Sequence, residues 1–319
     1  MDYTACNACG ECADVCPVTQ PDEYQMGLSS RKAIYIPFPQ AVPCSYILDM
    51  EHCLGNNPIA CGKCQDVCEK QAINYDDTDE VITREIGAII VAIGLDVYDP
   101  TEMDEYGYTR YDNVITSMEF ERLICAGGPT AGHFVRPGDG ERPKRIGFIQ
   151  CVGSRNPKIG RPWCSNICCM NTVKDTLLLA DHYPDVENVV YYQDIRAFGK
   201  SFEDMFQRSK ETGTRYVRGL PGDVEEDPKT GNLLVTVENT TSGKLERHEL
   251  DMLVLSVGVE PPKDLAKSSS RLTLSKTSDG FRMESHPKLK PVDAATRGVY
   301  FGGVCESPRV SEDSVCQAG

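Results

Sequence analysis

Short apolar runs alternate with an amphipathic stretch in the second half of the chain. Residues 144–150 and 186–192 have the length and the apolar centre of strands, and about residues 165–181 between them carry apolar positions at helical spacing. The order of strand, helix and strand, followed by Asp194, is typical of a dinucleotide-binding βαβ unit. The pattern therefore predicts a Rossmann-like α/β domain over residues 144–262.

The glycine fingerprint of such a unit is missing from this domain. Residues 150–155 read Gln-Cys-Val-Gly-Ser-Arg, where a dinucleotide-binding turn has G-x-G-x-x-G. The glycines that let the backbone approach a pyrophosphate are lost, and a long loop precedes the helix. Ordinary NAD(P) binding is therefore not expected in this domain.

Other parts of the pattern predict the remaining elements. Apolar runs that end in glycine read as buried strands at residues 85–94, 251–258 and 298–303. The capping-box residues Thr116 and Glu119 predict the start of a helix, and residues 232–238 and 244–250 predict a β-hairpin. With a Gly- and Pro-rich crossover before residue 144, the predicted division of the chain is into residues 1–75, 76–143, 144–262 and 263–319.

Composition and charge narrow the function classes. The chain has 319 residues, 40% apolar and 25% charged, which is typical of a globular protein. Lys and Arg number 33 against 48 Asp and Glu, so the formal charge is −15. Because nucleic-acid binding needs a basic surface, this balance argues against it. No apolar run is long enough to span a bilayer and no signal-peptide pattern is present, so we expect a cytoplasmic protein without a membrane span.

Sixteen cysteines are the unusual feature of the composition. Twelve of them form three groups of four: Cys6, Cys9, Cys12 and Cys16; Cys53, Cys61, Cys64 and Cys68; and Cys151, Cys164, Cys168 and Cys169. The other cysteines stand alone: Cys44, Cys125, Cys305 and Cys316. Four thiolates are the ligand set of a [4Fe–4S] cluster. Without a secretion signal, such groups indicate metal or redox chemistry rather than disulfides.

The first group has the bacterial ferredoxin spacing C-x2-C-x2-C-x3-C-P, which ends in Cys16 and Pro17. Three thiolates on one tight loop can bind one cluster, and the fourth then binds a second cluster. Gly10 lets the backbone of this loop turn close to the sulfurs. A zinc knuckle or reduced structural thiols are the alternatives, but zinc sites seldom use four cysteines this close together before a proline.

The second group keeps the C-x2-C-x3-C core, but Cys53 stands further upstream and Glu69 replaces the proline. By the ferredoxin crossing rule, each cluster takes three thiolates from one group and the last thiolate from the other. The expected ligand sets are Cys6, Cys9, Cys12 and Cys68 for one cluster, and Cys16, Cys53, Cys61 and Cys64 for the other. Cys44 is an alternative to Cys53. Residues 1–75 are therefore predicted to form a module with two [4Fe–4S] clusters.

The chain resembles the A subunit of heterodisulfide reductase, the flavin and iron–sulfur component of methanogens and many anaerobic bacteria. The matching stretches span essentially the whole chain: residues 31–41, 59–64, 111–117, 150–155 and 286–289. The resemblance implies an α/β fold with an inserted α+β part. In it, a two-cluster ferredoxin-like module is followed by a thioredoxin-reductase-like FAD/NAD(P)-type Rossmann flavoprotein domain, with residues 76–143 and 263–319 in its FAD-binding part.

Family members carry the FAD-binding G-x-G-x-x-G upstream of the ferredoxin insert and continue beyond the equivalent of Gly319. This chain is therefore expected to match the middle of such a protein and to hold an incomplete FAD half. Complete FAD binding would need an N-terminal half from elsewhere.

The resemblance also assigns the third cysteine group. Spacing alone leaves open whether Cys151, Cys164, Cys168 and Cys169 bind a cluster or include a pair of buried helix thiols. In the family these positions match a cluster site near the flavin.

Several further residues match positions at the flavin of the family. Lys174 and Glu121 match positions at the flavin ring, and Lys288 is a further candidate; a cation near N5 would stabilise reduced, anionic flavin. Glycines that match strand ends bordering FAD are Gly94, Gly258, Gly302 and Gly303. A solvated helix lysine and simple strand-end turns are the alternatives.

The resemblance implies an oxidoreductase of anaerobic metabolism that passes electrons among FAD, its clusters and partner subunits, with hydrogenase or ferredoxin as electron donor or acceptor. Two alternatives remain: an electron carrier without its own flavin, and a quinone-linked flavoprotein component of a membrane complex. A pyridine-nucleotide–disulfide oxidoreductase is disfavoured, because it needs a redox C-x-x-C, whereas three residues separate Cys164 from Cys168.

Overall fold

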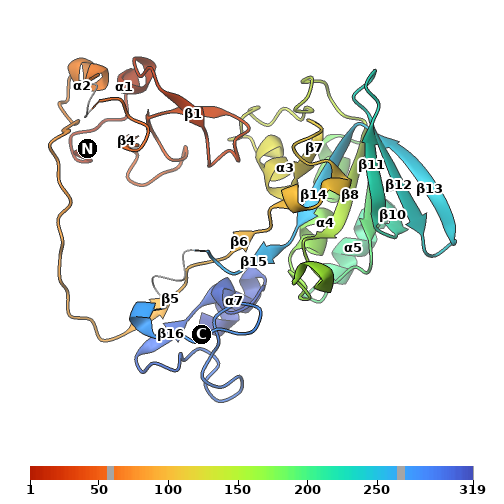
Figure 1. Ribbon diagram of the computed structural model, residues 1–319. Helices are drawn as coiled ribbons and strands as arrows, with labels where there is room; N and C mark the ends of the chain where they lie inside the picture. The colour runs from red at the N-terminus through yellow and green to blue at the C-terminus, as the bar shows by residue number, and fades with distance from the viewer. Residues whose placement is uncertain (56–60, 264–269, 319) are drawn as a thin grey trace. The chain divides into compact units, whose positions relative to one another are not determined.

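The computed structural model describes residues 1–55, 61–263 and 270–318 (Figure 1). The chain forms two compact units: unit 1 is Met1–Arg84 with Met118–Phe134, and unit 2 is Glu85–Ser117 with Val135–Gly319. The four-segment division expected from the sequence stays a prediction, and residues 59 and 60 of one family-like stretch lie outside the described residues. Within the described residues, no helix has the length and apolar character needed to cross a membrane.

Unit 1 is built from short elements. They are α1 (Glu11–Asp14), β1 (Thr19–Pro21), β2 (Ser30–Lys32), β3 (Ile34–Tyr35), β4 (Ile47–Leu48), α2 (Lys63–Val67) and most of α3 (Ser117–Ile124). β1 pairs with β2 and β3 pairs with β4, both antiparallel. α1 and α2 each follow a glycine in the left-handed region, Gly10 at φ 96° and Gly62 at φ 61°. The two C-G-x-C turns therefore fold alike, and each puts a buried cysteine, Cys12 or Cys64, on its short helix.

The capping-box helix predicted from the sequence is confirmed as α3. Arg122 on α3 donates a 3.0 Å hydrogen bond to Gln25, and its guanidinium lies 4.6 Å from the centre of the Tyr24 ring. Gln25 in turn donates to the carbonyl oxygen of Gly127 at 3.2 Å. These contacts attach residues 118–134 to the cysteine-rich segment and explain why they belong to unit 1.

Unit 2 centres on a five-stranded, fully parallel sheet (Figure 1). Its strand order is β10 (Arg215–Arg218), β9 (Glu187–Tyr192), β8 (Arg145–Val152), β14 (Met252–Val257) and β7 (Val114–Thr116). α4 (Cys168–His182) connects β8 to β9, which confirms the βαβ unit, and α5 (Phe202–Glu211) connects β9 to β10. α4 begins three residues later than expected, because the backbone of Asn166 is left-handed, with φ of 61°, and cannot continue a right-handed helix.

A three-stranded antiparallel sheet packs on one face of the parallel sheet. It consists of β11 (Pro221–Glu226), β12 (Leu233–Asn239) and β13 (Lys244–Leu250), and its last two strands confirm the predicted hairpin. Tyr191 of β9 stacks on His248 of β13 with ring centres 5.6 Å apart, inside a core that includes Val235 and Leu253. On the other side, the Tyr216 hydroxyl of β10 lies 2.7 Å from Ser209 of α5. The parallel sheet is therefore covered on both faces, as such sheets usually are.

Shorter elements complete unit 2. They are β5 (Ile89–Val91), β6 (Asp96–Val97), β15 (Val259–Glu260), β16 (Val299–Phe301), α7 (Ser311–Ala318) and the 3₁₀ turns η1 (Pro100–Glu102), η2 (Asp104–Tyr106), η3 (Pro157–Ile159) and η4 (Gly303–Cys305). β5 and β16 pair in parallel, and β6 pairs with β15. Strands are thus confirmed within residues 85–94, 251–258 and 298–303, but the first and third are only three residues long. The expected burial is confirmed for the middle strand alone. Val91 and Phe301 bury one face of the β5–β16 pair, whereas Ile90 and Tyr300 on the other face are 73% and 37% exposed.

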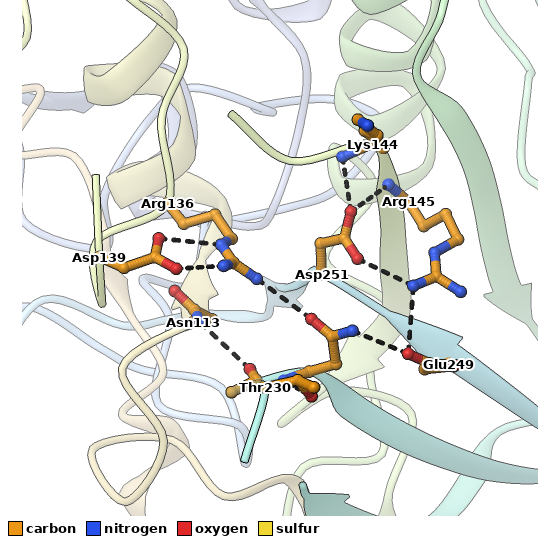
Figure 2. A network of polar contacts seen from close by, with 10 residues as sticks. Asn113, Arg136, Asp139, Lys144, Arg145, Thr230, Glu249 and Asp251 are labelled. Atoms are coloured by element: carbon orange, nitrogen blue, oxygen red, sulfur yellow. Dashed lines mark hydrogen bonds and ion pairs between the residues drawn. The ribbon is translucent and has the colours of Figure 1, made fainter. Parts of the chain in front are cut away.

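A polar network holds the amino edge of the parallel sheet together (Figure 2). Asp251, just before β14, accepts hydrogen bonds from the backbone N–H groups of Lys144 and Arg145 at 2.7 and 3.0 Å. Its second oxygen lies 3.2 Å from the Arg145 guanidinium, which also pairs with Glu249 at 3.2 Å. One carboxylate therefore joins the start of β14 to the start of β8.

Candidate metal centres

Four cysteines of unit 1 line one small cavity, cavity A. Its lining is Cys6, Cys9, Cys12 and Cys68 with Met1, Asn7, Glu11, Tyr46, Lys70, Ala72 and Ile73. A 2.7 Å backbone hydrogen bond from Asp2 to Ala72 ties the chain start to the turn after Cys68. The last thiol of the second motif thereby joins the first three of the first motif, which is the set that the crossing rule expects.

Four other cysteines of unit 1 line a second cavity, cavity B. Its lining is Cys16, Cys53, Cys61 and Cys64 with Pro17, Val18, Ile34, Leu48, Leu54, Lys63 and Tyr75. The unfilled space at cavities A and B is similar, about 330 and 290 Å³. Cys53 takes part in cavity B, whereas its alternative Cys44 is exposed and lines neither cavity.

Burial raises the pKa of one thiol in each of these cavities. It raises the pKa of Cys12 to about 11. It also raises the pKa of Cys64, where a hydrogen bond with the Tyr75 hydroxyl acts in the opposite direction. Buried thiols of this kind stay protonated at neutral pH unless a cation compensates the charge of the thiolate, and metal binding then releases the protons.

The thiols surround these cavities and do not converge on one point. Within residues 1–55, 61–263 and 270–318, no group of three or more His, Cys, Asp and Glu side chains is arranged to hold a single metal ion. In a [4Fe–4S] cluster each thiolate binds a different iron atom, so its ligands stand apart around the group. The donor set and the shape of cavities A and B therefore fit a cluster better than a mononuclear ion.

The third cysteine group lies at the carboxyl edge of the parallel sheet in unit 2. Cys151 is at the end of β8, and Cys168 and Cys169 open α4. The Cys168 thiol lies 3.5 Å from the carbonyl oxygen of Val257 at the end of β14. Because β8 connects to β9 on one side and has β14 on the other, this is the switch point of the sheet, where α/β folds bind ligands.

The four thiols of this group lie close enough to influence one another. Burial raises the pKa of Cys151 to about 11, and the negative charge of Cys169 adds to that rise. The pKa of Cys168 is also raised, by burial first and then by Cys169, Cys151 and Cys164. Burial at Cys151, Cys168 and Cys169 is unfavourable for thiolates until a cationic group joins the site.

An ion pair borders the third group. Arg155 pairs with Asp194 through both guanidinium nitrogens. The Arg155 guanidinium lowers the pKa of Cys151 against the larger effect of burial, whereas Asp194 contributes to the raised pKa of Cys169. The Arg155–Asp194 pair thus places opposite charges beside two thiols of one group.

The residues expected at a flavin are only partly brought together. Gly94 follows β5, and Gly302 and Gly303 follow the parallel strand β16, so these three share one sheet edge. Gly94 and Gly303 are left-handed, with φ of 76° and 72°. Gly258 lies elsewhere in unit 2, where an added Cβ would stand 2.9 Å from the carbonyl oxygen of Gly153; close packing within the protein already explains this glycine.

The charged flavin candidates lie in different places. Lys174 on α4 pairs at 3.1 Å with the fully buried Asp175, and its side chain is 36% exposed. Lys288 is exposed. Glu121 on α3 belongs to unit 1, whereas Lys174 and Lys288 belong to unit 2. Their roles at a flavin stay predictions.

Some residues at the candidate sites carried no signal in the sequence. Tyr46 and Tyr75 line cavities A and B, yet neither stands within a cysteine motif. Arg155 belongs to the sequence pattern at residues 150–155, and Asp194 is the acidic residue expected after β9. Neither pattern predicted that the two would pair beside the third cysteine group.

Comparison with known proteins identifies the family of the chain. No family model matches the chain. Over 319 residues it is 48% identical to the A subunit of the H(2):CoB-CoM heterodisulfide,ferredoxin reductase of Methanothermobacter thermautotrophicus, an alignment that covers all of this chain and 48% of the relative. Over 318 residues it is 50% identical to the second iron-sulfur A subunit of the CoB–CoM heterodisulfide reductase of Methanopyrus kandleri, covering 99% of this chain and 48% of the relative.

The chain belongs to the family of heterodisulfide reductase A subunits, which are oxidoreductase components, and spans about half the length of the curated relatives it matches. Among solved structures it is similar to T. acidophilum thioredoxin reductase, with a TM-score of 0.42 and 14% identity over 70% of this chain and 59% of the other. This structural likeness is too weak to decide the function.

Proposed function

We propose that this chain is the iron–sulfur part of a heterodisulfide-reductase-like A subunit, in which it relays electrons within a complex of anaerobic metabolism. The observation that carries the proposal is the division of eight cysteines between cavities A and B, four to each. Cys6, Cys9, Cys12 and Cys68 would hold one [4Fe–4S] cluster, and Cys16, Cys53, Cys61 and Cys64 a second. Cys151, Cys164, Cys168 and Cys169 would hold a third at the sheet edge of unit 2.

A [4Fe–4S] cluster supplies one-electron transfer when bound. The chain's own residues hold the thiols in place and limit water around them. Ile34 and Ile73 are buried next to cavities B and A, and the short helices α1 and α2 fix the buried thiols Cys12 and Cys64. A dry, rigid surrounding reduces the reorganisation that accompanies each change of charge.

FAD is the second cofactor of the proposal, and this chain supplies part of its site. Gly94, Gly302 and Gly303 form a glycine edge at parallel strands, with no atom within 4 Å of a Cβ built on Gly94. Parallel sheets are usually covered on both faces, yet the Ile90 and Tyr300 face is exposed. We infer that further polypeptide covers this face and completes the flavin site. Lys174 and Lys288 of unit 2 are the proposed charged contributors from the same unit, and Glu121 of unit 1 stays a separate candidate.

The relatives' names indicate the partners. They are called subunits of CoB–CoM heterodisulfide reductases linked to H(2), formate or ferredoxin. We propose corresponding partners for this chain, namely other subunits of such a complex and hydrogenase or ferredoxin, in the cytoplasm. The exposed β5–β16 face favours a second candidate, a carrier that holds clusters but no flavin by itself.

Anaerobic reconstitution of the 319-residue chain with iron and sulfide tests the proposal. A chain with three clusters should hold about twelve iron atoms, and a chain with only two clusters about eight. Cys164→Ser should lower the iron content by about four atoms and leave the EPR signals of the other two clusters; Cys125→Ser, at a cysteine outside the groups, should change nothing. A folded chain that takes up no iron contradicts the proposal. Added FAD that stays unbound would favour the carrier without its own flavin.

A further inference from the structure

Cavities A and B are alike in size and in their four thiols, but they differ at one hydroxyl. In cavity B the Tyr75 hydroxyl lies 2.9 Å from the sulfur of Cys64. In cavity A the corresponding aromatic residue is Tyr46. Within the described residues, the structure gives Tyr46 no hydrogen bond to a sulfur. Two tyrosines thus line two similar cavities, and one of them contacts a ligand thiol.

The Tyr75 hydroxyl must be the donor once the site holds metal. A free thiol and a hydroxyl can each donate, but a metal-bound Cys64 sulfur is a thiolate and carries no proton. The O–H group of Tyr75 then donates to a negatively charged sulfur, which is a stronger hydrogen bond than one between neutral groups. Backbone donors do not offset the difference, because both cavities have them. Gly55 donates to Cys53 at 3.3 Å in cavity B and Ala72 to Cys68 at 3.4 Å in cavity A, and backbone N–H groups also donate to Cys64 in cavity B and to Cys12 in cavity A.

The charged residues that line the two cavities, like the Tyr75 hydroxyl, favour the reduced state of a cluster more in cavity B than in cavity A. Lys63 is the charged side chain in the described lining of cavity B. In cavity A, Lys70 is balanced by Glu11. A cationic surrounding and hydrogen bonds to the sulfurs both stabilise the more negative, reduced state of a cluster and raise its reduction potential.

We infer that Tyr75 raises the reduction potential of the cluster in cavity B through its hydrogen bond to Cys64. Within the described residues, cavity A has no equivalent tyrosine–sulfur hydrogen bond. The inference rests on the proposed function, since it needs clusters in both cavities. Tyr75 is a positioning residue in this account: it does not accept the electron. With clusters bound, the Tyr75 hydroxyl would favour transfer of one electron from cavity A to cavity B, where the group in cavity A would be oxidised and the group in cavity B reduced.

Tyr75→Phe, with Tyr46→Phe as the matched control, tests the inference in the full reconstituted chain. Each variant removes one oxygen atom from an aromatic residue that lines a cysteine cavity. An EPR-monitored redox titration measures the ratio of reduced to oxidised cluster, and Cys9→Ser and Cys61→Ser assign the signals to cavities A and B. For Tyr75→Phe we expect the ratio for cavity B to fall roughly threefold to tenfold at fixed potential, where tenfold equals about 59 mV for one electron. Tyr46→Phe should leave both ratios unchanged.

Incorporation of 3-fluorotyrosine at position 75 gives a second test that keeps the hydroxyl and the ring. The more acidic phenol is a stronger donor, so the potential of the cavity B cluster should rise. Unchanged potentials in Tyr75→Phe and in the fluorinated protein, with both clusters present, overturn the inference and leave the proposed function intact. Absence of clusters from the wild-type chain refutes the proposed function instead.

Discussion

Gly153 follows Cys151, the first cysteine of the third group, by two residues. Its replacement by alanine tests how much the packing of this loop contributes to stability. The backbone of Gly153 is left-handed, with φ of 73°, and an added Cβ would stand 1.9 Å from Cδ1 of Tyr98. The Tyr98 ring is 1% exposed and cannot move aside into solvent. A methyl group at this position therefore meets both backbone strain and a ring that is fixed by its surroundings.

The structure allows the two costs to be separated. Left-handed backbone costs an alanine about 1–2 kcal/mol, and overpacking a buried contact costs about 1–3 kcal/mol. Gly153→Ala should therefore lower the free energy of unfolding by about 2–5 kcal/mol. Gly160 is the matched control, because its φ is 75° and a Cβ there has no atom within 4 Å. Gly160→Ala should show the strain alone, about 1–2 kcal/mol.

Urea unfolding of the iron-free chain under anaerobic, reducing conditions measures these free energies. The chain has one tryptophan. Trp163 donates to the carbonyl oxygen of Val259 at 3.0 Å and accepts from the backbone N–H of Arg155 at 2.8 Å, so its fluorescence reports on this loop. Adding Tyr98→Leu to Gly153→Ala should recover the clash contribution. The reasoning is refuted if Gly153→Ala and Gly160→Ala cost the same.

Three further predictions concern charges in unit 2. Arg155→Leu leaves Asp194 beside the third group with only its 3.9 Å ion pair to Arg196 among the described residues, and should lower the potential of the cluster, whereas Asp194→Asn should raise it. Shifts of the same sign in redox titrations would show that the Arg155–Asp194 pair acts only structurally. Asp251→Ala removes the acceptor of two backbone N–H groups and should lower the free energy of unfolding by about 1–3 kcal/mol. Asp139→Ala, at a surface ion pair, is the control and should cost less than about 1 kcal/mol. Burial raises the pKa of Glu306, so the native state binds the Glu306 proton more tightly than the unfolded state does. The free energy of unfolding should therefore fall as the pH rises from the ordinary pKa of a glutamate toward the raised pKa. Glu306→Gln should remove this fall in urea titrations at several pH values, and an unchanged pH profile would contradict the role given to Glu306.

The sequence predicted what depends on local spacing. The ferredoxin rule divides eight cysteines into the same two sets that line cavities A and B, because each loop delivers its thiols through a C-G-x-C turn. The capping box at Thr116 and Glu119 and the βαβ pattern were likewise local, and both predicted elements are present as α3 and as β8–α4–β9.

Long-range contacts were not predictable in this way. The hydrogen bond between Tyr75 and Cys64 joins α2 to a turn that follows it, and the contact between Gly153 and Tyr98 joins residues far apart in sequence. No spacing rule marks either one. The start of α4 was placed too early for a related reason, since the left-handed backbone of Asn166 depends on its surroundings, which include a 2.8 Å hydrogen bond to the carbonyl oxygen of Pro308.

Anomalous diffraction at the iron edge from crystals of the reconstituted chain tests the central claim most directly. The account predicts one four-iron cluster in each of cavities A and B, with Cys68 bound to the cluster of Cys6, Cys9 and Cys12, and Cys16 bound to the cluster of Cys53, Cys61 and Cys64. Iron absent from both cavities, or Cys16 and Cys68 each bound with the cysteines of its own motif, would contradict it.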